Sequence, residues 1–349
     1  MGAKCLAQTL PKCGDLAHLS RKGSGIHGRR GSGRLPSTTQ GEGGYAAVSR
    51  PFAFAHARAA HPPPFAPMPI TFLLELMLLG SFTGCFAGML GLGGGMLLVP
   101  FLTFMFTHQH FPPELVVHMA IATSLTTIVF TASSSVRMHH RRGAVQWSTV
   151  RWLGLGALLG TFVGAHVASH LHSGWLALFF GGFVGLSAIR MFSGAKPDAA
   201  QLPEQRLPAA GLVLAAGGGI GALSSMLGAG GGFLTVPFLR WRGVPMRTAV
   251  GTSAATGLLI AIGGLLGYVS AGLGAEGLPR YSMGYVYLPA LLACSATSVI
   301  SAPLGASLTH RLPVHLLQRV FSLVLLSLAS YMFFKGLQQM GWVAGAHHA

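Results

Sequence analysis

Two stretches decide the fold: Gly88–Leu102 reads GMLGLGGGMLLVPFL, and Ser225–Leu239 reads SMLGAGGGFLTVPFL. Eleven of these fifteen positions are identical, and the stretches lie 137 residues apart. A second pair follows in the same order, because Ala120-x-x-Thr123-Ser124 is matched by Ala249-x-x-Thr252-Ser253. This shared order indicates an internal duplication, a feature of many membrane transporters.

The composition excludes an ordinary soluble protein. Only 9% of the residues are charged, whereas a soluble domain carries roughly 25%. Apolar stretches follow one another from Ile70 to Leu337, and a membrane-spanning helix needs about 20 mostly apolar residues. We therefore expect an all-α integral membrane protein. The net charge of +16 does not indicate nucleic-acid binding, because the later basic residues are scattered singly in loops.

The composition also predicts the domain organisation. The first 67 residues are rich in Gly, Arg, Ser, Ala and Pro, so we expect a disordered extension. This extension is either a targeting peptide or, the reading we favour, the product of a misassigned start, with Met68 as the true one. The remaining regions are a first transmembrane repeat, a cytoplasmic linker, a second transmembrane repeat and a short tail: 68–192, 193–208, 209–337 and 338–349.

Each repeat is expected to contain about five helical segments. The segments are Ile70–Leu90, Met96–Phe106, Val117–Val136, Trp152–Leu171 and Trp175–Phe192, then Ala209–Leu227, Phe233–Leu239, Ala249–Ala271, Gly284–Leu308 and His315–Phe334. The second segment of each repeat is too short to cross a bilayer alone at about 1.5 Å per residue. Pro100 and Pro237 are expected to limit these short helices.

The loop charges predict the topology. Arginines and lysines gather in four loops: Arg137–Arg151, the linker region from Arg190 to Arg206, Arg240–Arg247, and the loop near Arg311. Basic loops stay in the cytoplasm. If each short segment crosses the membrane, all four loops fall on that side and the repeats are inverted, with the N-terminus outside. If the short segments are re-entrant, the parity changes.

The glycine runs predict breaks in the helices. Glycine is unfavourable in a helix interior and adopts positive φ freely. Unwound backbone at membrane depth is tolerated only inside the protein or around a wet cavity. The amides that open the next helix suit a small anion. The predicted substrate-binding residues are Gly91, Gly93, Gly94, Gly95, Thr123, Ser124, Gly228, Gly230, Gly231, Gly232, Thr252 and Ser253.

Simpler roles compete with these assignments. Glycines can merely allow close helix packing, as we expect at Gly80, Gly84 and Gly88, at Gly156, Gly160 and Gly164, and at Gly217 and Gly221. Thr and Ser hydroxyls can bond to their own helix. Glu75, His118, His166 and His170 are candidates for proton transfer, but an interfacial or packed position is the simpler reading. The chain has no metal-ligand spacing, and we expect no metal and no cofactor.

The duplicated motif resembles the sulfite exporter TauE/SafE family of membrane transporters. The resemblance rests on GCFAGMLGLGGGMLLVPFL at Gly84–Leu102, on its second copy, and on Ala249-Val250-Gly251-Thr252-Ser253. It implies transport of small sulfur-containing or organic anions across the inner membrane. The lead-ins to the two motifs differ, Ala87-Gly88 against Ser224-Ser225, so the two half-sites are unequal.

The expected function is a secondary transporter of a small anion such as sulfite or a sulfonate, with alternating access by rocking one half against the other. Its partners are the anion, the bilayer and a coupling proton or ion. An anion channel and a non-transport assembly protein remain alternatives. An enzyme is disfavoured, because the sequence has neither a nucleophile elbow nor a His-Glu metal motif.

Overall fold

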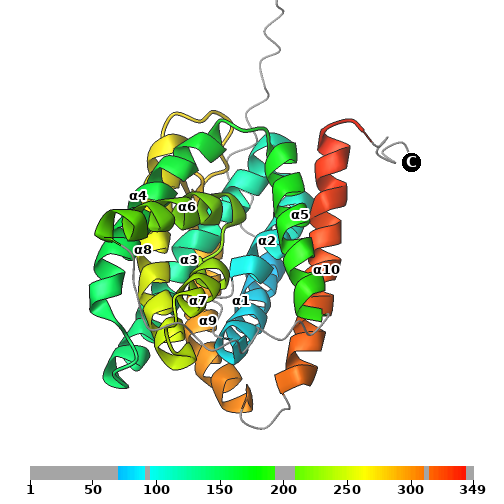
Figure 1. Ribbon diagram of the computed structural model, residues 1–349. Helices are drawn as coiled ribbons and strands as arrows, with labels where there is room; N and C mark the ends of the chain where they lie inside the picture. Colours follow the sequence, from blue (N-terminus) through cyan, green and yellow to red (C-terminus); the bar gives the residue numbers. More distant parts are fainter. Residues whose placement is uncertain (1–69, 91–94, 193–208, 310–313, 343–349) are drawn as a thin grey trace, which may run out of the picture. The chain divides into compact units, whose positions relative to one another are not determined.

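The computed structural model describes residues 70–90, 95–192, 209–309 and 314–342. The extension 1–67, the linker 193–208 and Gly91, Gly93 and Gly94 lie outside the described residues. The elements in chain order are α1 Ile70–Leu90, α2 Gly95–His108, α3 Pro113–Arg141, α4 Trp147–Ser169, α5 Ser173–Phe192, α6 Ala210–Leu227, α7 Gly232–Trp241, α8 Met246–Gly272, β1 Ser282–Met283, β2 Val286–Tyr287, α9 Leu288–Thr309 and α10 Val314–Gln339 (Figure 1).

The protein is an all-α, multi-pass membrane protein. Within the described residues, eight helices are long and apolar enough to cross a bilayer, and the apolar helix α2 is shorter. Large apolar side chains such as Ile70, Leu78 and Ile300 are exposed, as lipid contact requires. Each half contributes four long helices and one short helix, in the predicted order.

Two sequence expectations require correction. Pro100 and Pro237 do not limit the short helices, because α2 continues to His108 and α7 to Trp241. Each proline is the sixth residue of its helix, so its missing N–H removes a single early hydrogen bond. The expected span from Gly284 begins later, at Leu288, since Ser282–Met283 and Val286–Tyr287 form a short antiparallel hairpin.

The two halves are interlocked by an exchange of helix partners. Helix α1 of the first half packs along α9 of the second half, and α6 of the second half packs along α4 of the first. A Cβ on Gly84 would lie 2.5 Å from the Ser298 Cα, and a Cβ on Gly160 would overlap the Gly218 carbonyl. The packing role predicted for these glycines is confirmed, and it is the same small-residue packing in both helix pairs.

Equivalent helices of the two halves run in opposite directions where they touch. At one end, α3 and α8 meet where Arg247 donates to the Arg142 carbonyl oxygen. At the other end they meet through Tyr285, whose ring lies 5.5 Å from that of His118 and 6.2 Å from that of Tyr268. We call these the arginine end and the Tyr285 end.

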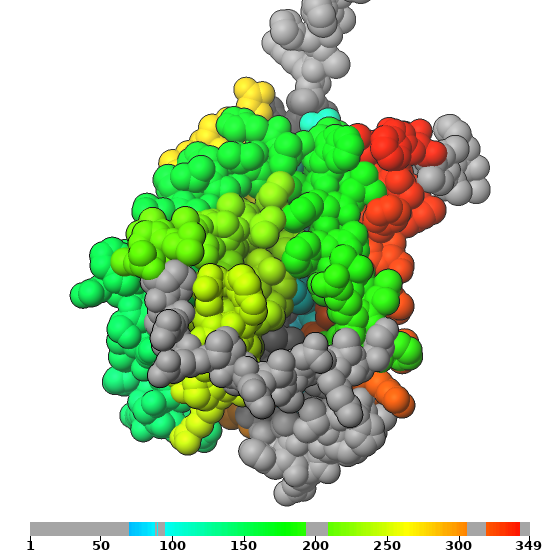
Figure 2. Space-filling model, in the orientation of Figure 1, coloured from blue at the N-terminus to red at the C-terminus, as the bar shows by residue number. Residues whose placement is uncertain are grey.

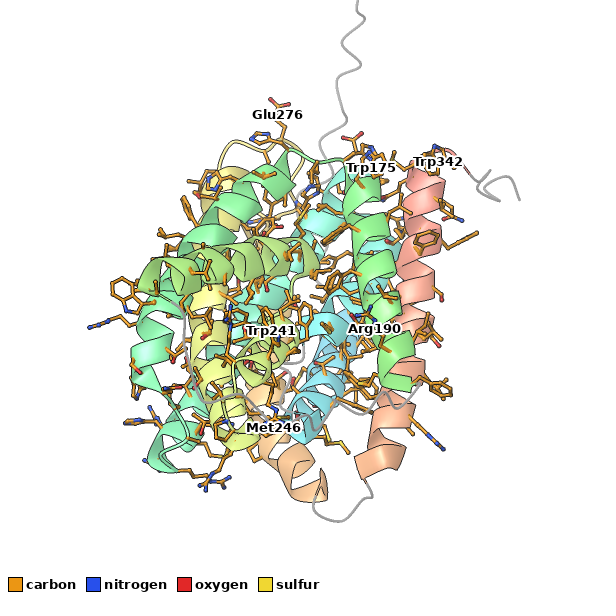
Figure 3. The ribbon with its side chains drawn as sticks, viewed as in Figure 1. Trp175, Arg190, Trp241, Met246, Glu276 and Trp342 are labelled. Carbon is orange, nitrogen blue, oxygen red and sulfur yellow. The ribbon has the colours of Figure 1, made fainter. Side chains whose placement is uncertain are left out.

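Helices α5 and α10 are also antiparallel, since Gly174 packs on Met340 and Gly181 packs on Phe333. They adjoin at one edge of the molecule (Figure 2). Trp175, Glu276 and Trp342 lie at one end of the helices and Met246 lies toward the other (Figure 3). Because Arg247 follows Met246, the Met246 end is the arginine end.

Gly160→Ala tests the interlocked packing. The added Cβ would meet Gly218 backbone, so we expect a loss of about 1–3 kcal/mol of stability. The matched control is Gly219→Ala on α6, where an added Cβ meets nothing within 4 Å. The midpoint temperature of thermal unfolding, measured on the purified protein in detergent, should fall for Gly160→Ala and not for Gly219→Ala. Equal midpoints would contradict this packing.

Candidate functional site

The second glycine motif forms a break with two left-handed residues. Helix α6 ends at Gly228, whose φ is 61° and whose amide donates to the Ser224 carbonyl oxygen. Helix α7 begins after Gly231, whose φ is 69°. Residues other than glycine rarely adopt these angles, so the left-handed backbone conformation explains why positions 228 and 231 are glycine. The chain turns between the two helices within four residues, all of them buried.

The start of α7 presents unused donors. Leu234 and Thr235 donate to the Gly231 carbonyl oxygen at 3.0 and 2.8 Å. The preceding amides, of Gly232 and Phe233, have no acceptor within the helix. Gly231, the residue before α7, has no side chain to cap the helix, and among the described residues these two amides have no backbone partner. This end of α7 therefore carries free N–H groups and a partial positive charge.

The start of α2 meets the second break inside the protein. A Cβ on Gly95, the first residue of α2, would lie 2.5 Å from the Gly228 carbonyl oxygen and 3.1 Å from the Ala229 Cα. Ser124 on α3 bridges the two, because its hydroxyl lies 2.8 Å from the Gly228 oxygen and 3.4 Å from the Gly95 oxygen. The structure thus brings Gly95, Ser124 and Gly228 together, as the sequence suggested. Gly91, Gly93 and Gly94 lie outside the described residues.

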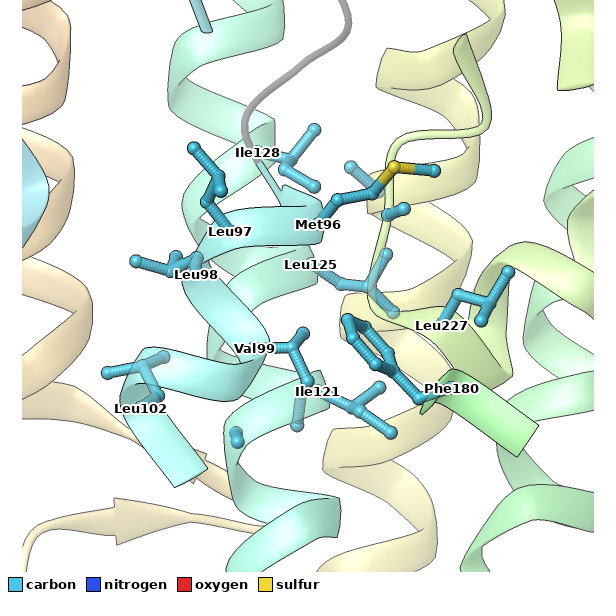
Figure 4. Packing of buried hydrophobic residues seen from close by; sticks show 14 of the residues in the cluster. Met96, Leu97, Leu98, Val99, Leu102, Ile121, Leu125, Ile128, Phe180 and Leu227 are labelled. Atoms are coloured by element: carbon cyan, nitrogen blue, oxygen red, sulfur yellow. The ribbon is translucent and has the colours of Figure 1, made fainter. Parts of the chain in front are cut away.

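Apolar side chains surround this meeting point. Val99 of α2, Ile121 of α3, Phe180 of α5 and Leu227 of α6 belong to one buried cluster (Figure 4). A Cβ on Gly228 would contact Val99 and come within 3.2 Å of the Ile121 Cα. The backbone groups freed by the breaks therefore lie in a dry environment, where an unsatisfied group is costly.

Ser224 has an unsatisfied hydroxyl beside the second break. It is fully buried, and its Oγ has no hydrogen-bond partner among the described residues. A Cβ on Gly231 would lie 3.1 Å from this Oγ, so the hydroxyl lies beside the residue that precedes α7. Its neighbour Ser225 instead donates to the Ala222 carbonyl oxygen of its own helix, at 2.6 Å. A buried hydroxyl of this kind is free to bond to a water or a ligand that reaches it.

A small cavity lies next to Gly95, between α1, α2, α3 and α9. Its volume is about 10 Å³, which is room for roughly one water molecule. Hydroxyl residues contribute to its walls, and the full lining is Thr83, Gly84, Ala87, Gly95, Leu98, Thr127, Ile128, Thr131 and Ser298. This cavity has no space for a multi-atom anion.

Thr123 and Thr252 do not share the role of Ser124. The Thr123 hydroxyl accepts the Tyr287 amide at 3.1 Å, and the Thr252 hydroxyl accepts the Gln146 amide at 3.1 Å. Each threonine thus holds a loop from the opposite half. Ser253 is buried, 4% exposed. Its counterpart in the first half, Ser124, donates to Gly228. The residue equivalent to Gly228 is Gly91, which lies outside the described residues.

The ionisable candidates lie away from the breaks. His118 is buried at the Tyr285 end, where Nε2 faces the carbonyl oxygens of Ala168 and Leu171 at 3.1 and 3.0 Å and Nδ1 faces that of Glu114 at 3.1 Å. Its contacts are those of a packed, satisfied side chain. Glu75 and His170 are exposed. Among the described residues, no cluster of His, Cys, Asp or Glu could hold a metal ion.

Ser124→Ala tests the bridge between the breaks. The substitution leaves the buried Gly228 carbonyl without its hydroxyl donor, so we expect a loss of about 1–3 kcal/mol. The control is Ser133→Ala on the same helix, whose exposed hydroxyl only bonds to the Val129 carbonyl oxygen. The midpoint temperature of thermal unfolding in detergent should be lower for Ser124→Ala than for Ser133→Ala. Similar midpoints would show that the bridge contributes nothing.

Comparison with known proteins agrees with the motif and the fold. Residues 76–332 match the family model described as Sulfite exporter TauE/SafE. A probable membrane transporter protein of Haemophilus influenzae is 37% identical over 267 residues, covering 76% of this chain and 99% of that protein. A probable membrane transporter protein of Methanocaldococcus jannaschii is 29% identical, covering 69% and 88%. No solved structure matches the chain. This chain belongs to the sulfite exporter TauE/SafE family of membrane proteins.

Proposed function

We propose that the protein transports a small anion, of the size of sulfite or a sulfonate, which binds where the two glycine breaks meet. The observation that carries this proposal is the second break, where the free amides of α7 and the unsatisfied Ser224 hydroxyl lie on either side of Gly231. Hydrogen-bond donors at a helix N-terminus are a common way to hold an oxyanion. The proposed site is completed by the two glycine runs, with Ser124 and Ser253 beside them.

Electrostatics favour an anion over a cation here. The described part of the chain contains three carboxylates, Glu75, Glu114 and Glu276, and all three are exposed. None of them is a residue of the breaks, so an anion meets no buried negative charge there. The positive end of the α7 dipole adds a favourable contribution.

The small cavity beside Gly95 favours alternating access over an open channel. About 10 Å³ admits one water molecule and no oxyanion, so we propose that the packing beside Gly95 loosens before substrate passes. Because helix partners are exchanged between halves, rocking one sequence half against the other would separate the tight α1–α9 and α4–α6 contacts. We propose instead that α1 moves together with α9 and that α6 moves together with α4.

The directions of the helices support inverted repeats. Helix α3 opposes α8 and α5 opposes α10, which is what an odd number of crossings in each half requires. Arg142 and Arg247 lie together at one end, and we propose that this end faces the cytoplasm of a cell whose inner membrane holds the protein.

Ser224→Ala tests the site. Removing the Ser224 hydroxyl, which has no partner among the described residues, should raise the KM for the anion at least about tenfold, because a hydrogen bond to a charged group is lost. Stability should hold or rise, since a buried unsatisfied hydroxyl disappears. The control Ser225→Ala removes a hydroxyl that is satisfied within its own helix and should leave KM unchanged.

The assay is flux of sulfite, sulfate, thiosulfate, sulfoacetate and simple carboxylates in proteoliposomes, with and without a proton gradient. Saturable flux and counterflow of labelled substrate support a transporter, whereas flux without counterflow supports a channel. An unchanged KM in Ser224→Ala would overturn the site. Absence of flux for every anion in the wild type would overturn the function and favour an assembly role.

A further inference from the structure

The loops that lead into α4 and α9 form a second duplicated motif. Gly143-Ala144-Val145-Gln146 precedes α4, and Gly284-Tyr285-Val286-Tyr287 precedes α9, so both read Gly-x-Val-x at a separation of 141 residues. Both glycines are left-handed, with φ of 63° and 56°. The helix begins directly after the fourth residue in each copy. The two copies therefore share a left-handed glycine and the position of the following helix start, although only the second copy includes a strand, β2.

The fourth residue of each copy makes the same contact with the opposite half. The Gln146 amide donates to Thr252 on α8, and the Tyr287 amide donates to Thr123 on α3, both at 3.1 Å. Both threonines are fully buried. The first contact lies near the arginine end, where Arg247 donates to the Arg142 carbonyl oxygen at 3.2 Å. The second lies toward the Tyr285 end, where the Tyr285 ring stacks on that of His118.

We propose that Thr123 and Thr252 are paired gate-holding residues, each fastening the start of a moving helix to α3 or α8 at one end of the transport path. Thr123 holds α9, which carries α1 with it, and Thr252 holds α4, which carries α6 with it. Helices α1 and α6 are the ones that end in the two glycine breaks. Release of either threonine contact thus opens one side of the proposed site and leaves the other side closed. Both contacts are formed here.

Loss of each threonine contact should favour opening at one end of the protein only. Replacing a buried threonine by valine keeps the shape of the side chain but leaves the loop amide without an acceptor. That amide regains a partner only when water reaches it, which happens when its own end opens. Thr123→Val should therefore favour opening at the Tyr285 end, and Thr252→Val should favour opening at the arginine end.

The test is the sidedness of thiol labelling. The reporter is Ala87→Cys, which lines the small central cavity, in a chain whose four cysteines have been replaced. A membrane-impermeant maleimide is added from one side or the other of sealed vesicles of known orientation. Thr123→Val should raise the labelling rate roughly threefold to tenfold from the Tyr285 side only, and Thr252→Val should do so from the arginine side only.

Matched controls lie one turn away on the same helices. Thr126→Val and Thr256→Val remove buried hydroxyls that donate to the Ala122 and Thr252 carbonyl oxygens of their own helices, at 2.8 and 3.0 Å. They should not change the sidedness. Faster labelling from both sides in either gate variant, or from neither, would overturn the proposal.

The inference rests on the proposed alternating access, but its test needs no substrate. Failure of all flux with sided labelling intact would reject the proposed anion while leaving the gates in place. Normal flux with no change in sidedness would reject the gates alone. A loss of folded protein in a gate variant is detected by size-exclusion chromatography, and Thr123→Ser and Thr252→Ser, which keep the acceptor, should then restore wild-type labelling.

Discussion

The structure depends on finding hydrogen-bond partners for backbone groups that lose their helical partners where a helix is broken inside the membrane. The Gly228 carbonyl oxygen is the clearest example: it is freed at the end of α6 and accepts the Ser124 hydroxyl of the other half at 2.8 Å. An unpaired carbonyl in this apolar core would cost about 1–3 kcal/mol. The exchange of helix partners holds the two breaks close enough for this bond to form.

Donors and acceptors are treated differently at the breaks. The carbonyl oxygen of Gly228 accepts a hydrogen bond from Ser124. Among the described residues, the first amides of α7 and the Ser224 hydroxyl have no partner. Spare donors with no nearby carboxylate suit an anion, and the proposed site rests on this. At the loops before α4 and α9, protein hydroxyls accept the loop amides, and in the proposed mechanism they hold each end closed.

Much of this arrangement follows from sequence. Apolar length predicts the long helices, and the duplicated glycine run predicts the breaks and their meeting. The pairing of α1 with α9 cannot be predicted from the sequence. Gly84 indicates that another helix packs closely on α1, but not which helix it is. The hairpin at Ser282–Tyr287 cannot be predicted either, because its tyrosines and valine resemble a helix start by hydropathy alone. Thr123 shows the same limit: a hydroxyl in a sequence does not reveal that a distant loop amide will use it.

The central claim is that the anion binds at the second break, and a structure determined with a heavy anion tests it most directly. Selenite is a close analogue of sulfite that scatters strongly. The account predicts selenite density within hydrogen-bonding distance of the Phe233 amide and the Ser224 hydroxyl, lost in Ser224→Ala. Density elsewhere in the protein, with those donors still unoccupied and selenite flux intact, would contradict it.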